Sequence, residues 1–154
     1  MSMDQSVVSS LKLLSGLLTD LHQPWWLIGP AAVGVLGGEP GKFTRLEVVM
    51  SPGDGRRISE AHDMPLVPGP ATPLKRARKS LTLPLGGLNA VLMVQVEQHV
   101  GGRWVAVNPK SRVATDLGDG RQVFTPNPAE LAAILRLSGR ASDIARAESL
   151  ERLG

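Results

Sequence analysis

Apolar residues recur every three or four positions near the start of the chain. Within residues 6–21 they are Val7, Val8, Leu11, Leu14, Leu17, Leu18 and Leu21. This spacing places one apolar stripe along an α-helix, so the sequence predicts an amphipathic helix within residues 1–22. Proline restricts the residue that precedes it to extended conformations, and we therefore expect the helix to end at Gln23-Pro24.

Between residues 25 and 124 the apolar residues form shorter runs, separated by turns. These runs predict strands at residues 25–28, 46–50, 88–100, 103–107, 112–115 and 121–124. The glycine-rich sequences at Gly101-Gly102 and around Asp119 predict two hairpins. A mixed β-sheet with antiparallel additions follows from this order of strands.

Two polar segments lie between the second and third of these strands. Residues 51–55, Ser-Pro-Gly-Asp-Gly, have the composition of a turn, and a short polar helix is predicted after them at residues 56–62. Residues 64–73 contain four prolines. This density of proline predicts an irregular surface loop.

Residues 127–153 carry clear helix boundary signals. Asn127 favours the N-cap of one helix, and Gly139 favours its end. Ser142 then predicts the cap of a second helix. Both helices are expected to pack on the sheet.

Composition limits the possible classes of protein. The chain has 154 residues, of which 42% are hydrophobic, and this is enough to bury one core. We therefore expect residues 1–154 to form a single α+β domain whose helices pack mainly on one face of a mixed sheet. The chain has no cysteine, which excludes disulfides, thiolate metal sites and a thiol nucleophile.

The sequence carries neither a leader pattern nor an apolar run of about 18 residues, so it predicts a cytoplasmic protein without membrane contact. The formal net charge of +3 is a small excess that indicates no particular partner. The densest positive charge is the run Lys-Arg-Ala-Arg-Lys at residues 75–79. This run is typical of a solvated face, and it is also a pattern that follows phosphates. No aromatic residue alternates with it in sequence, so binding of nucleic acid is not expected.

Gly29 follows the predicted strand at residues 25–28 directly and precedes a short helix that begins with Pro30. Glycine permits a sharp turn from strand to helix, and free N–H groups at the start of a helix attract phosphate. Two positions on the next strand share one face, where a pair of acidic residues would hold a divalent cation over that phosphate. Here the pair is Arg45 and Glu47.

The run Trp-Trp-Leu-Ile-Gly-Pro-Ala-Ala-Val at residues 25–33, followed by Arg-Leu-Glu-Val-Val-Met-Ser at residues 45–51, resembles the minimal nucleotidyltransferase domain of the DNA polymerase beta-like superfamily. Many small bacterial members end in helices with a Gly-Arg-x-x-Asp-x-x-Arg pattern. In this chain the pattern falls on Gly139, Arg140, Asp143 and Arg146. The resemblance covers most of the chain after the first helix and implies a nucleotidyltransferase-like fold. Asp143 and Arg146, three residues apart on a helix, are expected to form a weak surface pair.

The same resemblance implies that the metal-dependent chemistry is incomplete. The family's phosphate-binding serine falls on Pro30, which has neither a hydroxyl nor an N–H. Two metal-binding aspartates fall on Arg45 and Glu47, and a third carboxylate falls on Val91. Glu47 is then the only retained carboxylate, so no catalytic residue and no metal site are predicted. A lone glutamate beside an arginine is a poor ligand set for Mg²⁺.

Arg45 can instead pair with Glu47 and supply a fixed positive charge in place of the metal. Together with Gly29 and Ala31, these residues would form a metal-free site for a phosphate or a nucleotide. The simpler interpretation is a proline-initiated helix beside an ordinary solvated ion pair.

Three functions remain open from the sequence. The first is a nucleotidyltransferase-like protein that has lost metal-dependent transfer and retains nucleotide or phosphate binding, without a cofactor. The second is an active Mg²⁺-dependent nucleotidyltransferase with rearranged ligands. The third is a regulatory protein that binds a protein partner or a second copy of itself. The second function would require the fold to rebuild a metal site from other carboxylates, namely Glu39, Asp54, Asp63 and Glu97.

Overall fold

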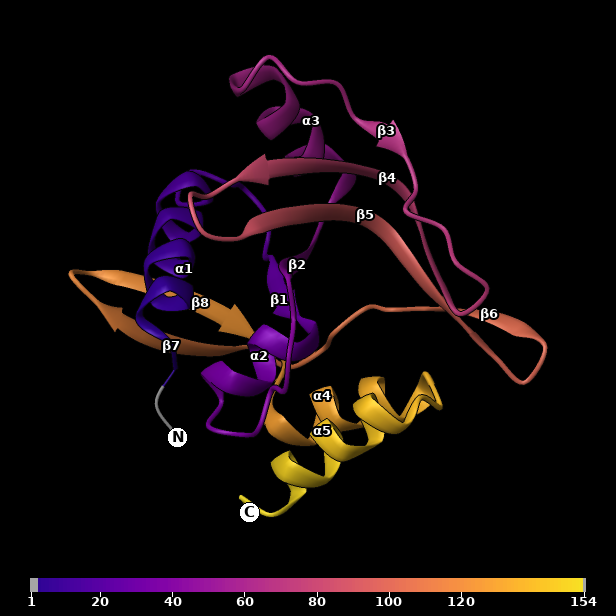
Figure 1. The fold of residues 1–154 in the computed structure, drawn as a ribbon. Coiled ribbons are helices and arrows are strands. Elements are labelled where there is room, and N and C mark those ends of the chain that lie inside the picture. The colour runs from indigo at the N-terminus through magenta and orange to yellow at the C-terminus, as the bar shows by residue number, and fades with distance from the viewer. Residues whose placement is uncertain (1–2, 154) are drawn as a thin grey trace.

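The computed structural model describes residues 3–153, which form five helices and eight strands (Figure 1). The helices are α1 (Gln5–Leu17), α2 (Gly29–Val35), α3 (Pro52–Ala61), α4 (Pro128–Leu137) and α5 (Ala141–Glu151). The strands are β1 (Trp26–Ile28), β2 (Arg45–Met50), β3 (Val67–Pro68), β4 (Lys75–Pro84), β5 (Asn89–Val100), β6 (Arg103–Ala106), β7 (Val113–Gly118) and β8 (Arg121–Thr125). None of the helices described is long and apolar enough to cross a membrane.

Six strands form one mixed sheet, in which β1, β2, β5, β4 and β3 are neighbours in that order and β6 pairs with the far end of β5. Within this sheet β2 and β5 run parallel, and the other pairs are antiparallel. The registers place Glu47 of β2 directly beside Ile28 on one side and Val91 on the other. The predicted α+β class with a mixed sheet is confirmed.

The two faces of the sheet carry separate apolar clusters, because side chains alternate between faces along a strand. The larger cluster lies between the sheet and α1, α2 and α3 and continues into α4 and α5. Its fully buried members include Leu11, Leu27, Leu46 and Leu92. The smaller cluster, on the opposite face, contains Ile28, Val49, Ala77, Val91, Met93, Val96 and Val107. Ile134 of α4 packs against this second cluster. The second face is the one toward which Glu47 points.

Helix α1 is shorter than the sequence predicts. Asp4 caps its first turn by accepting a hydrogen bond from the Ser6 N–H at 2.8 Å, and the helix ends at Leu17. Leu18 and Leu21 follow the helix and still pack in the core. The predicted helix is too long because these two leucines continue the apolar spacing although they lie outside the helix.

The turn predicted at residues 51–55 is wrong, because these residues form the start of α3. Ser51 is the N-cap, and its hydroxyl accepts a hydrogen bond from the Asp54 N–H at 3.1 Å. Pro52 follows at the first helical position, where the missing N–H would be unpaired anyway. Serine, proline and aspartate favour both turns and helix starts, so composition did not separate the two.

Asp54 joins α3 to the segment before β1. Its side chain is fully buried and accepts hydrogen bonds from the N–H groups of His22 at 3.1 Å and Gln23 at 2.9 Å. Arg57 Nη1 also donates to it at 3.1 Å. Burial raises the pKa of Asp54, but the backbone hydrogen bonds and Arg57 outweigh burial and hold the pKa below its usual value. The carboxylate is therefore an ionised structural link.

The hairpin predicted around Asp119 forms, but β7 and β8 make a separate two-stranded sheet. Strand β8 contacts α1 and β1. The ring of Phe124 meets Trp25 edge to face at a centroid distance of 5.4 Å, and the Arg112 guanidinium lies 3.5 Å from the centroid of the Phe124 ring. These contacts attach the hairpin to the segment that leads into β1.

Helices α4 and α5 pack on each other and on α2, rather than both lying directly on the sheet (Figure 1). Asn127 caps α4 as predicted, because its side chain accepts a hydrogen bond from the Glu130 N–H at 2.8 Å. Gly139 follows α4 with a φ of +72°, a conformation that favours glycine after a helix. The predicted Ser142 cap is wrong, since α5 begins at Ala141 and has no side-chain cap.

Removal of the Asp54 carboxylate leaves two backbone N–H groups and Arg57 without their acceptor. We expect Asp54→Ala to lower the free energy of unfolding at pH 7 by about 2–3 kcal/mol, measured by urea denaturation. Asp20→Ala is the control, because Asp20 is an exposed aspartate close to the same segment. Equal and small losses in the two variants would contradict the structural role of Asp54.

Candidate functional site

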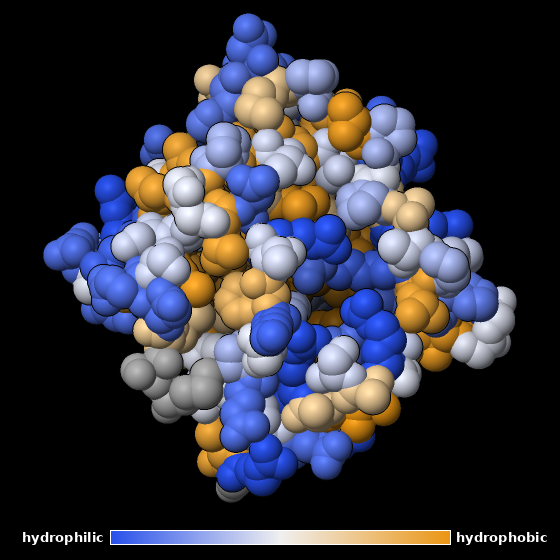
Figure 2. All heavy atoms as spheres, in the orientation of Figure 1, coloured by the Kyte–Doolittle hydropathy of each residue, from blue (hydrophilic) through white to orange (hydrophobic). Residues whose placement is uncertain are grey.

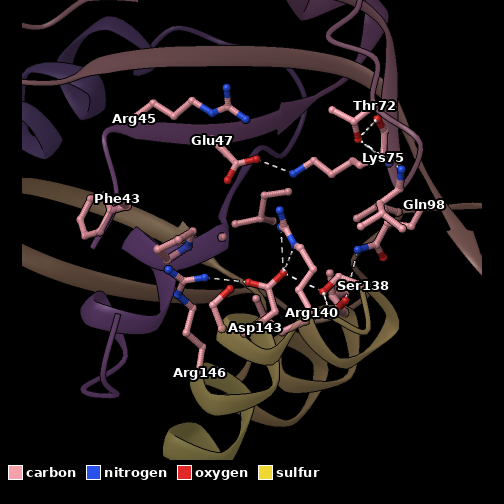
Figure 3. A pocket seen from close by; sticks show the side chains of 18 of the residues that line it. Phe43, Arg45, Glu47, Thr72, Lys75, Gln98, Ser138, Arg140, Asp143 and Arg146 are labelled. Atoms are coloured by element: carbon pink, nitrogen blue, oxygen red, sulfur yellow. Dashed lines mark hydrogen bonds and ion pairs between the residues drawn. The ribbon is translucent and has the colours of Figure 1, made fainter. Parts of the chain in front are cut away.

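A cleft of about 360 Å³ opens on the face of the sheet that carries the smaller apolar cluster. Its walls come from the β1–α2 turn, the segment that enters β2, the start of β4, and the junction of α4 with α5 (Figure 3). In Figure 2 the cleft is visible as a hollow between hydrophilic side chains, with apolar surface inside it. Its volume is within the range of small-molecule sites.

Basic side chains outnumber acidic ones in this cleft. The lysines and arginines that line it are Lys42, Arg45, Lys75, Arg76, Arg140 and Arg146. The acidic residues that line it are Glu47 and Asp143. Six cations against two anions in a concave site favour an anionic ligand.

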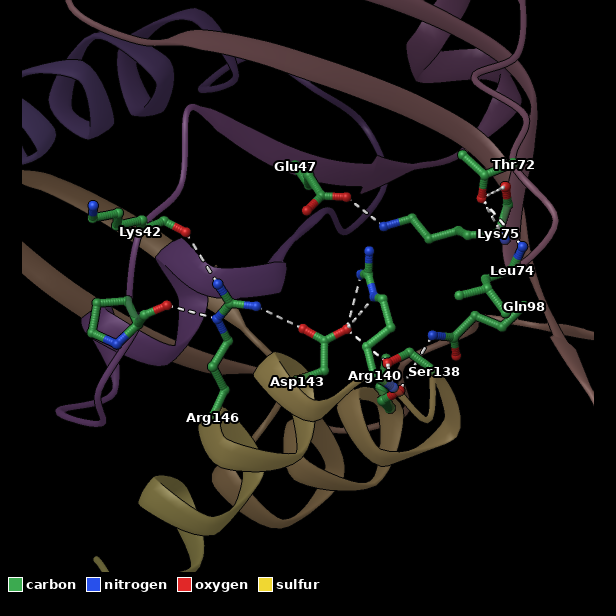
Figure 4. Close-up of polar contacts among 12 residues, drawn as sticks. Lys42, Glu47, Thr72, Leu74, Lys75, Gln98, Ser138, Arg140, Asp143 and Arg146 are labelled. Carbon is green, nitrogen blue, oxygen red and sulfur yellow. Dashed lines mark hydrogen bonds and ion pairs between the residues drawn. The ribbon is translucent and has the colours of Figure 1, made fainter.

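Glu47 lies at the centre of one wall. It projects from β2, is only 9% exposed, and forms an ion pair through Oε1 with Lys75 Nζ. Lys75 begins β4 opposite Gln98 of β5, whereas Glu47 lies beside Val91 of the same strand, so the ion pair joins residues at different levels of the sheet. Figures 3 and 4 show the long lysine side chain extending from the start of β4 to the Glu47 carboxylate. The carboxylate is therefore neutralised by a residue from a distant strand.

The predicted pair of Glu47 with Arg45 is wrong. Arg45 lines the cleft and is exposed, but the structure pairs Glu47 with Lys75 instead. The Cα atoms of residues two apart on one strand are separated by about 6–7 Å. A lysine from another strand can place its ammonium directly against the Glu47 carboxylate. Lys75 was not predicted as a site residue, because it belongs to a basic run whose pattern favoured a solvated face.

The basic run at residues 75–79 forms the start of β4, so its side chains alternate between the two faces of the sheet and have different surroundings. Arg76 pairs with Glu97 at 2.9 Å, and its guanidinium lies 4.0 Å from the centroid of the Trp104 ring. Arg78 and Lys79 are exposed, as the solvated-face interpretation predicted. Lys75 alone among the five residues turns to Glu47.

Gly29 brings the backbone close to the Glu47 carboxylate. The chain turns from β1 into α2 at Gly29 with a φ of +74°, which favours glycine. A Cβ atom at this position would lie 2.5 Å from Glu47 Oε2. Ala31, by contrast, is buried in the core and does not line the cleft. The structure therefore brings together Gly29, Arg45 and Glu47, but not Ala31.

Mg²⁺, which the family resemblance implies, does not fit these residues. Glu47 already binds the Lys75 ammonium, and its neighbours in the sheet, Ile28 and Val91, have no ligand atoms. Among residues 3–153 no three histidine, aspartate or glutamate side chains are close enough to hold a metal ion. The other carboxylates that the sequence suggested do not line the cleft, namely Glu39, Asp54, Asp63 and Glu97. Mg²⁺ requires several oxygen ligands in near-octahedral geometry.

Asp143 forms the opposite wall and is bound on all sides. Its carboxylate accepts hydrogen bonds from Ser138 Oγ at 2.7 Å, Arg140 Nη2 at 2.9 Å and Arg146 Nη1 at 2.8 Å. Burial raises the pKa of Asp143, but these three hydrogen bonds outweigh burial and lower the pKa from its usual value. Asp143 is thus a fixed anion that orients two arginines toward the cleft.

Arg146 ties α5 to the segment before β2. Its Nε donates to the carbonyl oxygen of Pro40 at 2.6 Å, and its Nη2 donates to that of Lys42 at 3.1 Å (Figure 4). The predicted Asp143–Arg146 pair is confirmed, but its position is not the helix surface, because the two side chains are only 5% and 13% exposed. The motif is therefore part of the wall of the cleft.

Comparison with known proteins finds similarity in the fold of the chain and not in its sequence. No protein-family model and no curated protein match the sequence significantly. The structure is similar to the crystal structure of a proposed nucleotidyltransferase from Thermotoga maritima, with a TM-score of 0.67, 14% identity, and coverage of 99% of this chain and 94% of that chain.

Two further solved structures have the same architecture. An antigenic nucleotidyltransferase-like protein from Paracoccidioides brasiliensis matches with a TM-score of 0.61 and 14% identity over 98% of this chain and 78% of its own. The solution structure of the antibiotic-resistance factor ANT(2″)-Ia matches with a TM-score of 0.58 and 12% identity over 99% of this chain and 86% of its own. The chain therefore has a nucleotidyltransferase-like fold, as the resemblance in sequence predicted.

A methyl group at Gly29 would strain the backbone and displace the Glu47 carboxylate. We expect Gly29→Ala to lower the free energy of unfolding by more than the roughly 1–2 kcal/mol that the positive φ alone costs. Gly86→Ala is the matched control, because Gly86 has a φ of +84° with open space around its Cβ position. The difference in free energy of unfolding between the Gly29→Ala and Gly86→Ala variants should shrink when each is combined with Glu47→Ala. Equal losses for the two glycines, measured by urea denaturation, would contradict the close contact.

Asp143 should make stability depend on pH in the acid range. Its pKa is lower in the folded protein than in the unfolded chain, so its stabilisation is complete above the unfolded value of about 3.9 and is lost as the pH falls through the folded value. We expect the free-energy difference between wild type and Asp143→Asn to be largest near neutral pH and to shrink below about pH 4. Urea denaturation at several pH values measures it, with Asp20→Asn as the control. A difference that is constant with pH would contradict this role.

Proposed function

We propose that this protein is a non-catalytic nucleotidyltransferase-like protein that binds a phosphate-bearing ligand, such as a nucleotide, in the basic cleft without a metal ion. The observation that carries the proposal is the ion pair between Glu47 and Lys75. A divalent cation in a nucleotidyl transfer site is held by carboxylates and neutralises phosphate oxygens. Here the side-chain ammonium of Lys75 neutralises Glu47, the carboxylate that would have to hold such an ion.

The remaining cations are placed to bind phosphate directly. Lys42 and Arg45 line the cleft without an ion-pair partner in the described part of the chain, and the Arg140 side chain is 60% exposed although it bonds Asp143. Guanidinium and ammonium groups form charge-assisted hydrogen bonds with phosphate oxygens. Binding by such groups needs no metal, and salt should weaken it by screening.

Isothermal titration with inorganic tripolyphosphate tests this function. We expect binding in the presence of EDTA, with no gain in affinity when Mg²⁺ is added. Lys75→Gln should weaken binding by about tenfold, because it removes a cation and leaves the Glu47 charge unpaired. Glu47→Gln should leave binding unchanged or strengthen it, because it removes an anion from the cleft.

Lys12→Gln is the control for loss of a lysine charge, because Lys12 pairs with Asp119 and does not line the cleft. The active Mg²⁺-dependent alternative makes the opposite prediction for Glu47→Gln, which would then abolish binding of the metal complex. Binding that requires Mg²⁺ and is lost in Glu47→Gln would overturn the proposal. Absence of tripolyphosphate binding under all conditions would also overturn it.

A further inference from the structure

A second groove, of about 460 Å³, lies between the end of α1 and the β7–β8 hairpin, two elements that lie side by side in Figure 1. It shares no lining residue with the basic cleft. Arg112, which directly precedes β7, lines this groove together with Trp25 and Phe124. None of the described aspartates and glutamates lines it. The groove therefore holds a positive charge that no carboxylate of its walls neutralises.

The Arg112 guanidinium is held in one orientation. Its Nε donates a hydrogen bond to the carbonyl oxygen of Trp25 at 3.2 Å, and its Cζ lies 3.5 Å from the centroid of the Phe124 ring. Phe124 meets Trp25 edge to face, so the ring against the guanidinium is fixed as well. These contacts reduce the conformational entropy that Arg112 would lose on binding a ligand.

The charge of Arg112 has no counter-ion in the described part of the fold. Among residues 3–153 no carboxylate pairs with it, and its two Nη groups donate to no acceptor. Burial lowers the pKa of Arg112, because desolvation disfavours the charged form. A guanidinium nevertheless stays charged near neutral pH. The N–H groups of both Nη atoms, on a partly desolvated cation, thus lack acceptors.

We propose that this groove binds the carboxylate of a ligand with an apolar body, and that the two Nη groups of Arg112 donate to its two oxygens. With Nε occupied and one face on Phe124, the free edge of the guanidinium is a planar pair of donors that matches a carboxylate. Leu18, Leu21 and Pro24 line the groove beside the aromatic rings and suit the apolar body. The site lies apart from the basic cleft, so it does not depend on the function proposed above.

The surroundings favour a carboxylate over a polyphosphate. Arg112 is the one lysine or arginine among the described residues that lines this groove, whereas six line the basic cleft. One fixed cation suits a ligand with a single negative charge. The end of α1 borders the groove, and two of its backbone carbonyls already have donors. Thr19 Oγ1 donates to the Ser15 carbonyl at 2.9 Å, and the Leu21 N–H donates to that of Leu18 at 3.3 Å.

Nuclear magnetic resonance titration of the full ¹⁵N-labelled chain with benzoate tests the inference, and benzamide is the neutral analogue of similar shape. The backbone signals of Ser15, Trp25 and Phe124 report on this groove separately from the basic cleft. We expect benzoate to shift them and to bind about tenfold more tightly than benzamide. Arg112→Gln should reduce the affinity for benzoate to that for benzamide.

Arg112→Lys provides a second variant that keeps the charge, in case Arg112→Gln does not fold. Its ammonium cannot donate a parallel pair of hydrogen bonds, so this variant should also bind benzoate more weakly than wild type. Arg121→Gln is the matched control, since Arg121 is an exposed arginine of the same hairpin that does not line the groove. It should leave the affinity for benzoate unchanged.

A free acid and the end of a polypeptide both supply a carboxylate, so acetyl-Ala-Ala-Phe with a free carboxyl terminus is titrated beside its C-terminal amide. Tighter binding of either acid than of its amide supports the inference, and the tighter acid identifies the source. Equal affinities for the acids and their amides would overturn it, and so would a benzoate affinity unchanged in Arg112→Gln or Arg112→Lys. Absence of binding by both acids would do the same and would leave the function proposed for the basic cleft intact.

Discussion

The ion pair between Glu47 and Lys75 joins the centre of the sheet to the chemistry of the cleft. Glu47 lies between Ile28 and Val91, and its second oxygen is close to the backbone of Gly29. An unpaired carboxylate in such apolar surroundings is strongly unfavourable. Lys75 removes that cost, and in doing so it connects β4 to β2 and cancels the charge of the one carboxylate that projects from β2 into the cleft.

The second wall of the cleft has the same physical basis. Asp143 is buried, and Ser138, Arg140 and Arg146 satisfy its oxygens. Arg146 in turn donates hydrogen bonds to backbone carbonyls of the segment before β2, and these bonds connect α5 to that segment. Both carboxylates of the cleft are thus held by cations within the fold. The charge that remains available to a ligand is positive, which favours phosphate and disfavours a metal ion.

The fold and the proposed function rest on different observations. Similarity to solved nucleotidyltransferase structures at 12–14% identity shows a shared architecture, and one architecture supports many functions. The proposed function depends on the cleft, where Val91 and Lys75 lie beside Glu47 and no set of metal ligands converges among the described residues. These contacts are the basis on which we propose metal-free binding in a fold shared with nucleotidyltransferases.

The sequence by itself determined the features that depend on neighbouring residues. The strands other than β3 and β4, the turn at Gly29, the cap at Asn127 and the Asp143–Arg146 spacing were readable because each arises within a few residues of chain. Strands β3 and β4 were missed, because prolines and a basic run hid them. Local signals failed at residues 51–55, where a turn and a helix start use the same residue types. The family resemblance supplied the fold as a whole, which local pattern alone did not specify.

Only the tertiary structure decided which cation neutralises Glu47 and that Asp143 is buried. These facts depend on strand order, on register and on the packing of α4 and α5, which bring together residues that are far apart in sequence. A lysine in a basic run has no local mark that separates it from its neighbours. Its partner is set by where the sheet places it, and that is why charge pattern alone pointed to Arg45.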